Sequence, residues 1–204
     1  MSTRWLEWAQ EMISNAQAGL EYTGNPFDKE RYEKLRKLAA VIVAEHAGLE
    51  MEKVEQLFAS DAGYQTPKVD VRAVVQNDAK LLLVRERDGE WALPGGWAEP
   101  RLTLKENLVK EVLEEAGMRV RPRKVLAILD RAHHAGDVYP YSVYKIFVRC
   151  DLLGGEFVQN IETQAAGFFS EGELPPLSKT RNTAAQLRMC FRHLRSDQEE
   201  LEFD

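Results

Sequence analysis

One segment of the sequence carries the signals for both ends of a helix, and it constrains the fold more than any other segment. Thr103 is followed three residues later by Glu106, which is the spacing of a capping box at a helix start. Gly117 suits the left-handed conformation that ends many helices. Apolar residues recur between them at the three-and-four spacing of one helical face. We therefore predict a helix over residues 104–116 whose apolar face packs on a core.

Carboxylates lie beside that apolar face. Glu111, Glu114 and Glu115 are close enough in sequence to project from adjoining positions of the helix. Like charges at this spacing repel by about 0.2–0.5 kcal/mol per pair, and on its own such a group is often a solvated surface. A hard divalent cation reverses the effect because it takes oxygen ligands. Gly95 and Gly96 precede the helix, and backbone without side chains can approach a cation or a phosphate closely. The combination favours a site for both.

Periodicity divides the chain into a helical part and a part with strands. Residues 1–60 have helical spacing, with one helix expected over 28–46, and residues 63–67 resemble a linker. Strands are expected at 69–75, 80–85, 91–93, 124–130, 141–150 and 167–170, followed by a helix over 183–194 and a loose tail over 198–204. The expected fold class is α+β, with a mixed sheet between helices and a small all-helical domain before it. We place the two domains at residues 1–64 and 65–204.

Charge and composition exclude several classes of protein. The chain has 204 residues, and its 27 basic and 33 acidic side chains give a net charge of −6, which disfavours nonspecific binding of nucleic acid as the main activity. No apolar run approaches the ~20 residues of a membrane span, and the N-terminus lacks the apolar core of a signal peptide. Cys150 and Cys190 have no metal-type spacing and fit reduced thiols. We expect a cytoplasmic protein with no membrane partner.

The segment from the double glycine to the helix end resembles the box of the Nudix hydrolase family, G-x5-E-x7-R-E-U-x-E-E-x-G-U, where U is a bulky aliphatic residue. Seven of the nine specified positions match: Gly96, Glu111, Val112, Glu114, Glu115, Gly117 and Met118. Leu102 stands where the family has Glu, and Lys110 stands where it has Arg. In the family those two residues mainly support the loop and the helix, so the departures bear on loop geometry and full activity more than on metal binding. Our hypothesis is that the two changes are tolerated as a pair.

The resemblance covers residues 69–194, and the helical N-terminal segment looks like that of a bacterial branch containing CDP-choline and ADP-ribose pyrophosphatases. It implies a Nudix-type α/β/α sandwich and hydrolysis of a nucleoside diphosphate linked to a moiety X, giving a nucleoside monophosphate and phospho-X. By the family pattern, Glu111, Glu114 and Glu115 hold Mg²⁺ or Mn²⁺, and the carbonyl of Gly96 is a further ligand. Glu115 is also a candidate catalytic residue.

Members of the family often recruit one more carboxylate, as base or ligand, from a loop beyond the box. Glu162 is the candidate here, because its offset from the later Leu174-Pro175 reproduces the family's spacing between that acid and a following Glu-Leu-Pro. The alternative is an ordinary loop carboxylate.

Substrate contacts are predicted from residues on or beside the expected strands and the box. Arg72, Arg85 and Arg131 are candidates for paired hydrogen bonds to phosphates, with surface salt bridges as the alternative. Trp97 follows the double glycine and is expected either to form a wall of the site or to pack in the core.

Two other functions stay open. A Nudix fold that has lost catalysis would bind a nucleotide as a regulator, which the intact carboxylate trio disfavours. An RNA-processing hydrolase would use basic residues of the last helix, Arg181, Arg188, Arg192 and Arg195, although a solvated polar face also explains them. Trp5 and Trp8 in the helical segment are expected to pack either on the catalytic domain or on a second copy of the chain, and a homodimer is the expected protein partner.

Overall fold

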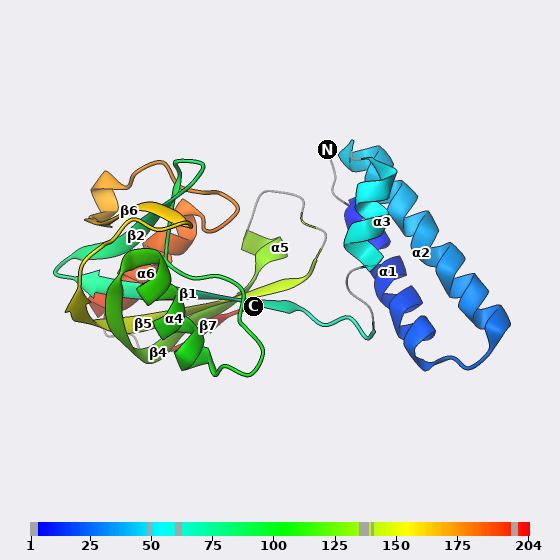
Figure 1. Ribbon diagram of the computed structural model, residues 1–204, viewed down its shortest axis with the longest axis horizontal. Helices are drawn as coiled ribbons and strands as arrows, with labels where there is room; N and C mark the ends of the chain where they lie inside the picture. Colours follow the sequence, from blue (N-terminus) through cyan, green and yellow to red (C-terminus); the bar gives the residue numbers. More distant parts are fainter. Residues whose placement is uncertain (1–3, 49, 60–62, 135–138, 140, 197–199) are drawn as a thin grey trace. The chain divides into compact units, whose positions relative to one another are not determined.

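The computed structural model describes residues 4–48, 50–59, 63–134, 139, 141–196 and 200–204. The chain forms two compact units, one of residues 1–67 with 138–141 and the other of residues 68–137 with 142–204 (Figure 1). No described helix is both long and apolar enough to cross a bilayer.

The N-terminal unit is helical, as predicted. Its helices are α1 (Arg4–Tyr22), α2 (Pro26–Ala47) and α3 (Met51–Ala59). The second helix begins where the side chain of Asn25 accepts a hydrogen bond from Phe27 N at 2.9 Å, and it ends at Gly48 with φ +65°. The small core of this unit contains Ala9, Ile13, Ala39, Ala40, Val43 and Val54. Three of these residues are alanines, whose small side chains let α1 and α2 pack closely.

The second unit contains a mixed sheet. Its strands are β1 (Lys68–Asn77), β2 (Lys80–Glu86), β3 (Trp91–Ala92), β4 (Met118–Asp130), β5 (Val143–Gly155), β6 (Thr163–Phe169) and β7 (Glu202–Phe203). The spatial order is β3-β2-β1-β5-β4-β7, with β6 paired to β2. The pairs β1–β5 and β4–β7 are parallel, and the other pairs are antiparallel. The helical elements are α4 (Leu104–Ala116), α5 (Arg131–His134), the 3-10 helix η1 (Glu171–Glu173) and α6 (Ala184–Ser196).

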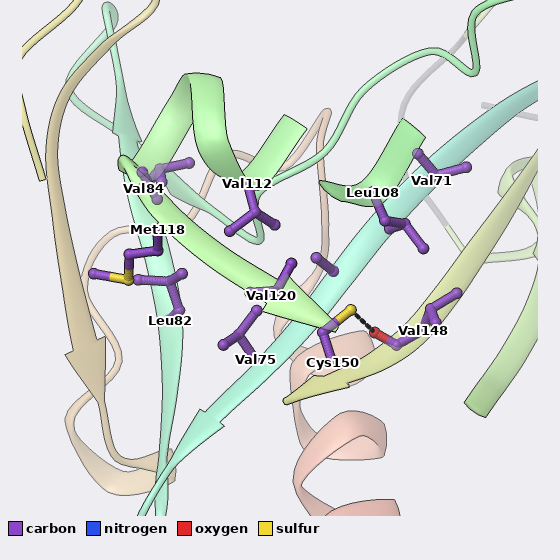
Figure 2. Packing of buried hydrophobic residues seen from close by; sticks show 12 residues of the cluster. Val71, Val75, Leu82, Val84, Leu108, Val112, Met118, Val120, Val148 and Cys150 are labelled. Carbon is purple, nitrogen blue, oxygen red and sulfur yellow. Dashed lines mark hydrogen bonds between the residues drawn. The ribbon is translucent and has the colours of Figure 1, made fainter. Parts of the chain in front are cut away.

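Helices cover both faces of this sheet because its strands are apolar on both sides. Val71 and Val75 of β1 pack with Leu108 and Val112 of α4 in one buried cluster (Figure 2). Val74, the neighbour of Val75, belongs instead to the cluster that contains residues of α6. Successive residues of the strand thus point into the two cores on opposite faces of the sheet. The predicted sandwich is confirmed, and α4 is held by burial of its apolar face, worth about 1.5–3 kcal/mol per large side chain.

The C-terminal tail is the clearest departure from the expected elements. The prediction of a loose tail is wrong over residues 202–203, because β7 pairs in parallel with Ala127 and Ile128. Asp204 extends this attachment: its carboxylate accepts from Asp130 N at 2.6 Å and lies 2.7 Å from His134 Nε2. These contacts hold the end of the chain at the edge of the sheet. A short strand of this kind carries no local pattern.

Two strands also begin earlier than predicted. β4 starts at Met118 instead of Lys124, and it crosses Pro122 with a shift in its register to β5. Its first residues alternate between buried Met118 and Val120 and exposed Arg119 and Arg121, which is the period of a half-buried strand. β6 likewise starts before the predicted residue 167.

Candidate active site

The double glycine forms a turn that lies against β1. Val71 N donates to Gly96 O at 2.8 Å, and Ala73 N donates to Pro94 O at 2.9 Å. Gly95 has φ +139°, and a Cβ there would lie 1.9 Å from Val71 O. No other residue fits without moving the backbone, which is the physical reason for glycine at this position.

Helix α4 begins and ends where predicted. Glu106 N donates to Thr103 Oγ1 at 3.3 Å, and Thr103 N donates to Glu106 Oε2 at 2.8 Å, which completes the capping box. Gly117 closes the helix with φ +66° and donates its N–H to Leu113 O at 3.0 Å. Both ends are thus held by the local sequence, and the carboxylates between them have defined positions on the helix.

Asn107 ties the loop before α4 to the helix, a role that the sequence analysis missed. Its Oδ1 accepts from Glu99 N at 2.7 Å, and its Nδ2 donates to Thr103 O at 3.1 Å. Lys110 adds a second tie, since its Nζ lies 3.2 Å from a Glu99 oxygen and 2.5 Å from a Glu114 oxygen. Although Leu102 and Lys110 depart from the family box, the loop is held. No clear signal for this role was present in the sequence, because Asn107 lies on the carboxylate side of the predicted helix, between Glu111 and Glu114, and its burial is visible only in the structure.

Glu115 is the most buried of the three carboxylates. The residue is only 8% exposed to solvent, and its Oε2 accepts a hydrogen bond from Gly95 N at 2.8 Å. Burial raises the pKa of Glu115 to about 8, against the opposing effects of the Gly95 hydrogen bond and the Arg72 charge. Burial also raises the pKa of Glu111, and the negative charges of Glu114 and Glu162 add to that rise. Both shifts arise chiefly because burial disfavours the charged form of these carboxylates.

Glu162 lies on a loop fastened to the end of α4. Asn160 Oδ1 accepts from Glu162 N at 2.8 Å, while Asn160 Nδ2 donates to Glu114 O at 2.8 Å. Thr163 Oγ1 donates to Glu115 O at 2.6 Å. These bonds bring the loop to the carboxylate end of the helix, although 46 residues separate Glu114 from Asn160 in sequence.

The predicted metal residues and Glu162 line one cleft of about 630 Å³. Its lining consists of Glu86, Arg87, Gly95, Gly96, Trp97, Glu99, Lys110, Glu111, Glu114, Glu115, Ile161, Glu162 and Arg181. Six of these residues are carboxylates and three are cations, so the cleft has an excess of negative charge and many oxygen donors. Sequence reasoning missed Glu86, Arg87, Glu99, Ile161 and Arg181 as parts of it.

The chemistry of this donor set suits a hard divalent cation, which prefers carboxylate and carbonyl oxygens. As the side chains stand, no three described His, Cys, Asp or Glu residues are gathered into a group that could hold an ion. Two of the carboxylates have other partners: Lys110 contacts that of Glu114, and Gly95 N donates to that of Glu115.

The three arginines predicted to bind phosphate do not line the cleft. Arg72 is completely buried, with Nε 2.6 Å from Asp70 Oδ1 and Nη1 donating to Leu93 O at 3.1 Å. We therefore replace its predicted phosphate contact with a structural role at the glycine turn. Arg131 is buried in α5, and Arg85 is half-buried on β2. Of the predicted substrate contacts, only Trp97 lines the cleft, and it is 43% exposed.

The proposed basic stripe on the last helix is not a continuous cationic face. Arg181 precedes α6 and pairs with Glu86. Arg192 pairs with Glu202, and Arg195 pairs with Glu171. These carboxylates neutralise much of the charge that was expected to meet RNA.

Comparisons with known proteins agree with this architecture. A family model described as the NUDIX domain matches residues 66–189, and one described as a UDP-X-like, N-terminal oligomerisation domain matches residues 3–58. A candidate ADP-ribose pyrophosphatase named YjhB, from Bacillus subtilis (strain 168), is 44% identical over 205 residues that span 100% of this chain and 99% of that protein.

Two solved structures are also similar. An ADP-ribose pyrophosphatase from Streptococcus suis 89-1591 is 49% identical, covers 68% of this chain and 100% of its own, and has a TM-score of 0.64. The crystal structure of a UDP-X diphosphatase is 32% identical, covers 98% of both chains, and also has a TM-score of 0.64. The fold and the carboxylate helix thus define a pyrophosphatase of the hydrolase class. The chain belongs to the Nudix hydrolase family, whose members generally use divalent metal ions.

Proposed function

We propose that this enzyme hydrolyses the pyrophosphate linkage of a nucleoside diphosphate joined to a moiety X, releasing a nucleoside monophosphate and phospho-X. The observation that carries the proposal is the cleft in which Glu111, Glu114 and Glu115 of α4 meet Glu162 of a distant loop. ADP-ribose is the first substrate to test, because two similar proteins are named for its hydrolysis. CDP-choline is a second candidate.

The same proposal includes dependence on Mg²⁺ or Mn²⁺. Glu111, Glu114 and Glu115 would hold the ion, with the carbonyl of Gly96 as a further ligand; that carbonyl already accepts from Val71 N and has a second lone pair. When bound, the ion supplies positive charge that polarises the phosphoryl oxygens and favours deprotonation of water. The raised pKa values of Glu111 and Glu115 support this assignment, since a nearby cation would relieve their electrostatic cost.

The chain's own residues supply positioning and proton transfer. Glu162 accepts the proton of the attacking water, for which its exposed carboxylate in the cleft is suitably placed. Glu115 is fixed by Gly95 N–H, so its free oxygen has a defined direction. Trp97 and Ile161 offer apolar surface to the base or to X, and both are exposed residues of the cleft lining.

We also propose that the enzyme is a homodimer joined through its N-terminal unit. The matched family model is described as an oligomerisation domain. Trp8 and Leu38 in this unit are more than half exposed, and they would gain by burial against a second copy. Light scattering of the full chain tests this, and a monomer across the micromolar range would contradict it.

The state of the two cysteines is consistent with a protein that acts in a reducing compartment such as the cytoplasm. Cys150 and Cys190 are both buried and unpaired with each other. Burial raises the pKa of Cys150 to about 12 and also raises the pKa of Cys190, so neither thiol is reactive.

The experiment for the reaction is a panel of nucleoside diphosphate conjugates, including ADP-ribose and CDP-choline, incubated with Mg²⁺ or Mn²⁺ and resolved by chromatography. Formation of nucleoside monophosphate with phospho-X supports the proposal, and Glu115→Gln should form neither product. A folded protein that cleaves no conjugate would contradict it and favour a nucleotide-binding regulator. Cleavage confined to RNA ends would favour the RNA-processing alternative.

A further inference from the structure

One arginine of the cleft is held by two contacts to a single carboxylate. Arg181 Nε lies 3.1 Å from Glu86 Oε1, and Arg181 Nη2 donates to Glu86 Oε2 at 3.2 Å. The Glu86 side chain is 18% exposed and that of Arg181 is 41% exposed, so the pair is partly shielded from water but open to the cleft that both residues line. Two-point pairing of this kind sets the plane of a guanidinium as well as its position.

The segment that carries Arg181 is itself anchored by buried polar groups. Lys145 of β5, a residue only 3% exposed, donates to the carbonyl of Arg181. The next residue, Asn182, accepts from Leu93 N at 2.8 Å through Oδ1. Arg181 N in turn donates to Ser178 O at 3.1 Å. A short segment before α6 is thus fixed to the sheet and to the strand that leads into the glycine turn.

The guanidinium of Arg181 has N–H donors that Glu86 does not use. An arginine side chain has five N–H donors; Glu86 accepts a hydrogen bond from Nη2, and its other carboxylate oxygen lies 3.1 Å from Nε as an ion pair. Nη1 of Arg181 has no hydrogen-bond partner within the part of the chain that the structure describes. By contrast, Lys110, another cation of the cleft, is occupied by Glu99 and Glu114.

We propose that Arg181 binds the diphosphate of the substrate through its remaining N–H donors while Glu86 orients its guanidinium. This inference rests on the proposed function, because it assigns a contact to the substrate of that same cleft. A phosphate oxygen is a strong acceptor, and arginine presents paired donors that match it. Glu86 therefore serves as a positioning residue, and Arg181 replaces the buried Arg72 as the arginine that reaches substrate.

The experiment compares wild type, Arg181→Ala and Arg181→Lys, with Arg123→Ala as the matched control. Arg123 forms an exposed pair with Asp151 on the same unit but does not line the cleft. Calorimetry measures binding of α,β-methylene-ADP, whose bridging carbon resists hydrolysis, with Mg²⁺ present. A second titration with Mn²⁺ alone checks the carboxylates, and circular dichroism checks folding.

Arg181→Ala should weaken binding of the analogue about 10-fold to 100-fold, since a charge-assisted hydrogen bond is lost. KM for ADP-ribose should rise by a similar factor, while uptake of Mn²⁺ alone stays at the wild-type level. Arg181→Lys keeps the charge but cannot bind Glu86 and phosphate together, so it should also bind more weakly than wild type. This variant carries the test if Arg181→Ala does not fold.

Wild-type affinity in Arg181→Ala, in an enzyme that cleaves ADP-ribose, would overturn this inference and leave the proposed function standing. Wild-type affinity in Arg181→Lys would overturn the part assigned to Glu86. A wild-type protein that neither binds the analogue nor cleaves a conjugate would overturn both proposals.

Discussion

The carboxylate of Glu115 accepts a hydrogen bond from the backbone N–H of Gly95 at 2.8 Å, which joins α4 to the glycine turn. The turn in turn lies on β1, where Val71 N donates to Gly96 O at 2.8 Å. Two hydrogen bonds thus connect the sheet to the turn and the turn to the buried carboxylate of Glu115. The position of Glu115 depends on the close approach of two backbones as much as on its own helix.

Gly95→Ala should destabilise the enzyme by about 2–4 kcal/mol, because the new Cβ would collide with the β1 backbone and strain φ. Its contact with Val71 O would be 1.9 Å. Urea denaturation measures the loss. Gly89→Ala is the control, since Gly89 also has positive φ, +87°, but a Cβ there meets open space. Equal losses in both variants would contradict the importance of the close approach.

Asn107→Ala should cost about 1–3 kcal/mol of stability, because two backbone groups each lose a part-buried hydrogen bond worth about 0.5–1.5 kcal/mol. The groups are Glu99 N and Thr103 O. Thermal unfolding measures this, and turnover should fall as the loop loosens. Asn15→Ala removes an exposed amide that donates to Glu11 O at 3.0 Å, and it should change little. A stable, fully active Asn107→Ala would mean that Lys110 alone supports the loop.

Glu162→Gln should lower kcat by about 100-fold or more, the contribution expected of a general base. Its melting temperature should stay near that of wild type because the side chain is exposed. Glu156→Gln is the control, an exposed carboxylate outside the cleft lining. Unchanged turnover in Glu162→Gln would end the assignment of Glu162 as the base.

Stability of the metal-free enzyme should fall with rising pH because of Glu115. Its pKa is raised to about 8 in the folded protein. A raised folded pKa favours the protonated form, so the stabilisation is complete below the unfolded pKa and is lost as pH rises through about 8. Denaturation in EDTA at pH 6 and pH 8.5 should show this loss in wild type, and a smaller loss in Glu115→Gln, which cannot ionise. Parallel curves would contradict the pKa shift.

Local sequence was sufficient where the structure depends on local chemistry. Thr103, Glu106 and Gly117 marked both ends of α4, and the helical periods located the N-terminal unit. β7 was not predicted because its pairing joins residues 202–203 to residues 127–128, and pairing so distant leaves no periodic signal in two residues.

Only part of the cleft lining was predictable from the sequence. Glu111, Glu114 and Glu115 follow one helical spacing, and Glu162 follows a recognisable offset. The same cleft is also lined by Glu86 at the end of β2 and by Arg181 before α6, which only the folded chain brings together. Sequence spacing instead placed Arg181 on a helical stripe, and it could not tell that Arg72 is buried beside Asp70.

Uptake of divalent cations by the carboxylates of α4 is the most direct test of the account. Isothermal titration of the full chain with Mn²⁺ or Mg²⁺ should give saturable binding in wild type and in the control Glu156→Gln. The combined change of Glu111, Glu114 and Glu115 to Gln should abolish it while the protein stays folded. Absence of saturable binding of either ion by the wild-type chain, with and without α,β-methylene-ADP, would contradict the account.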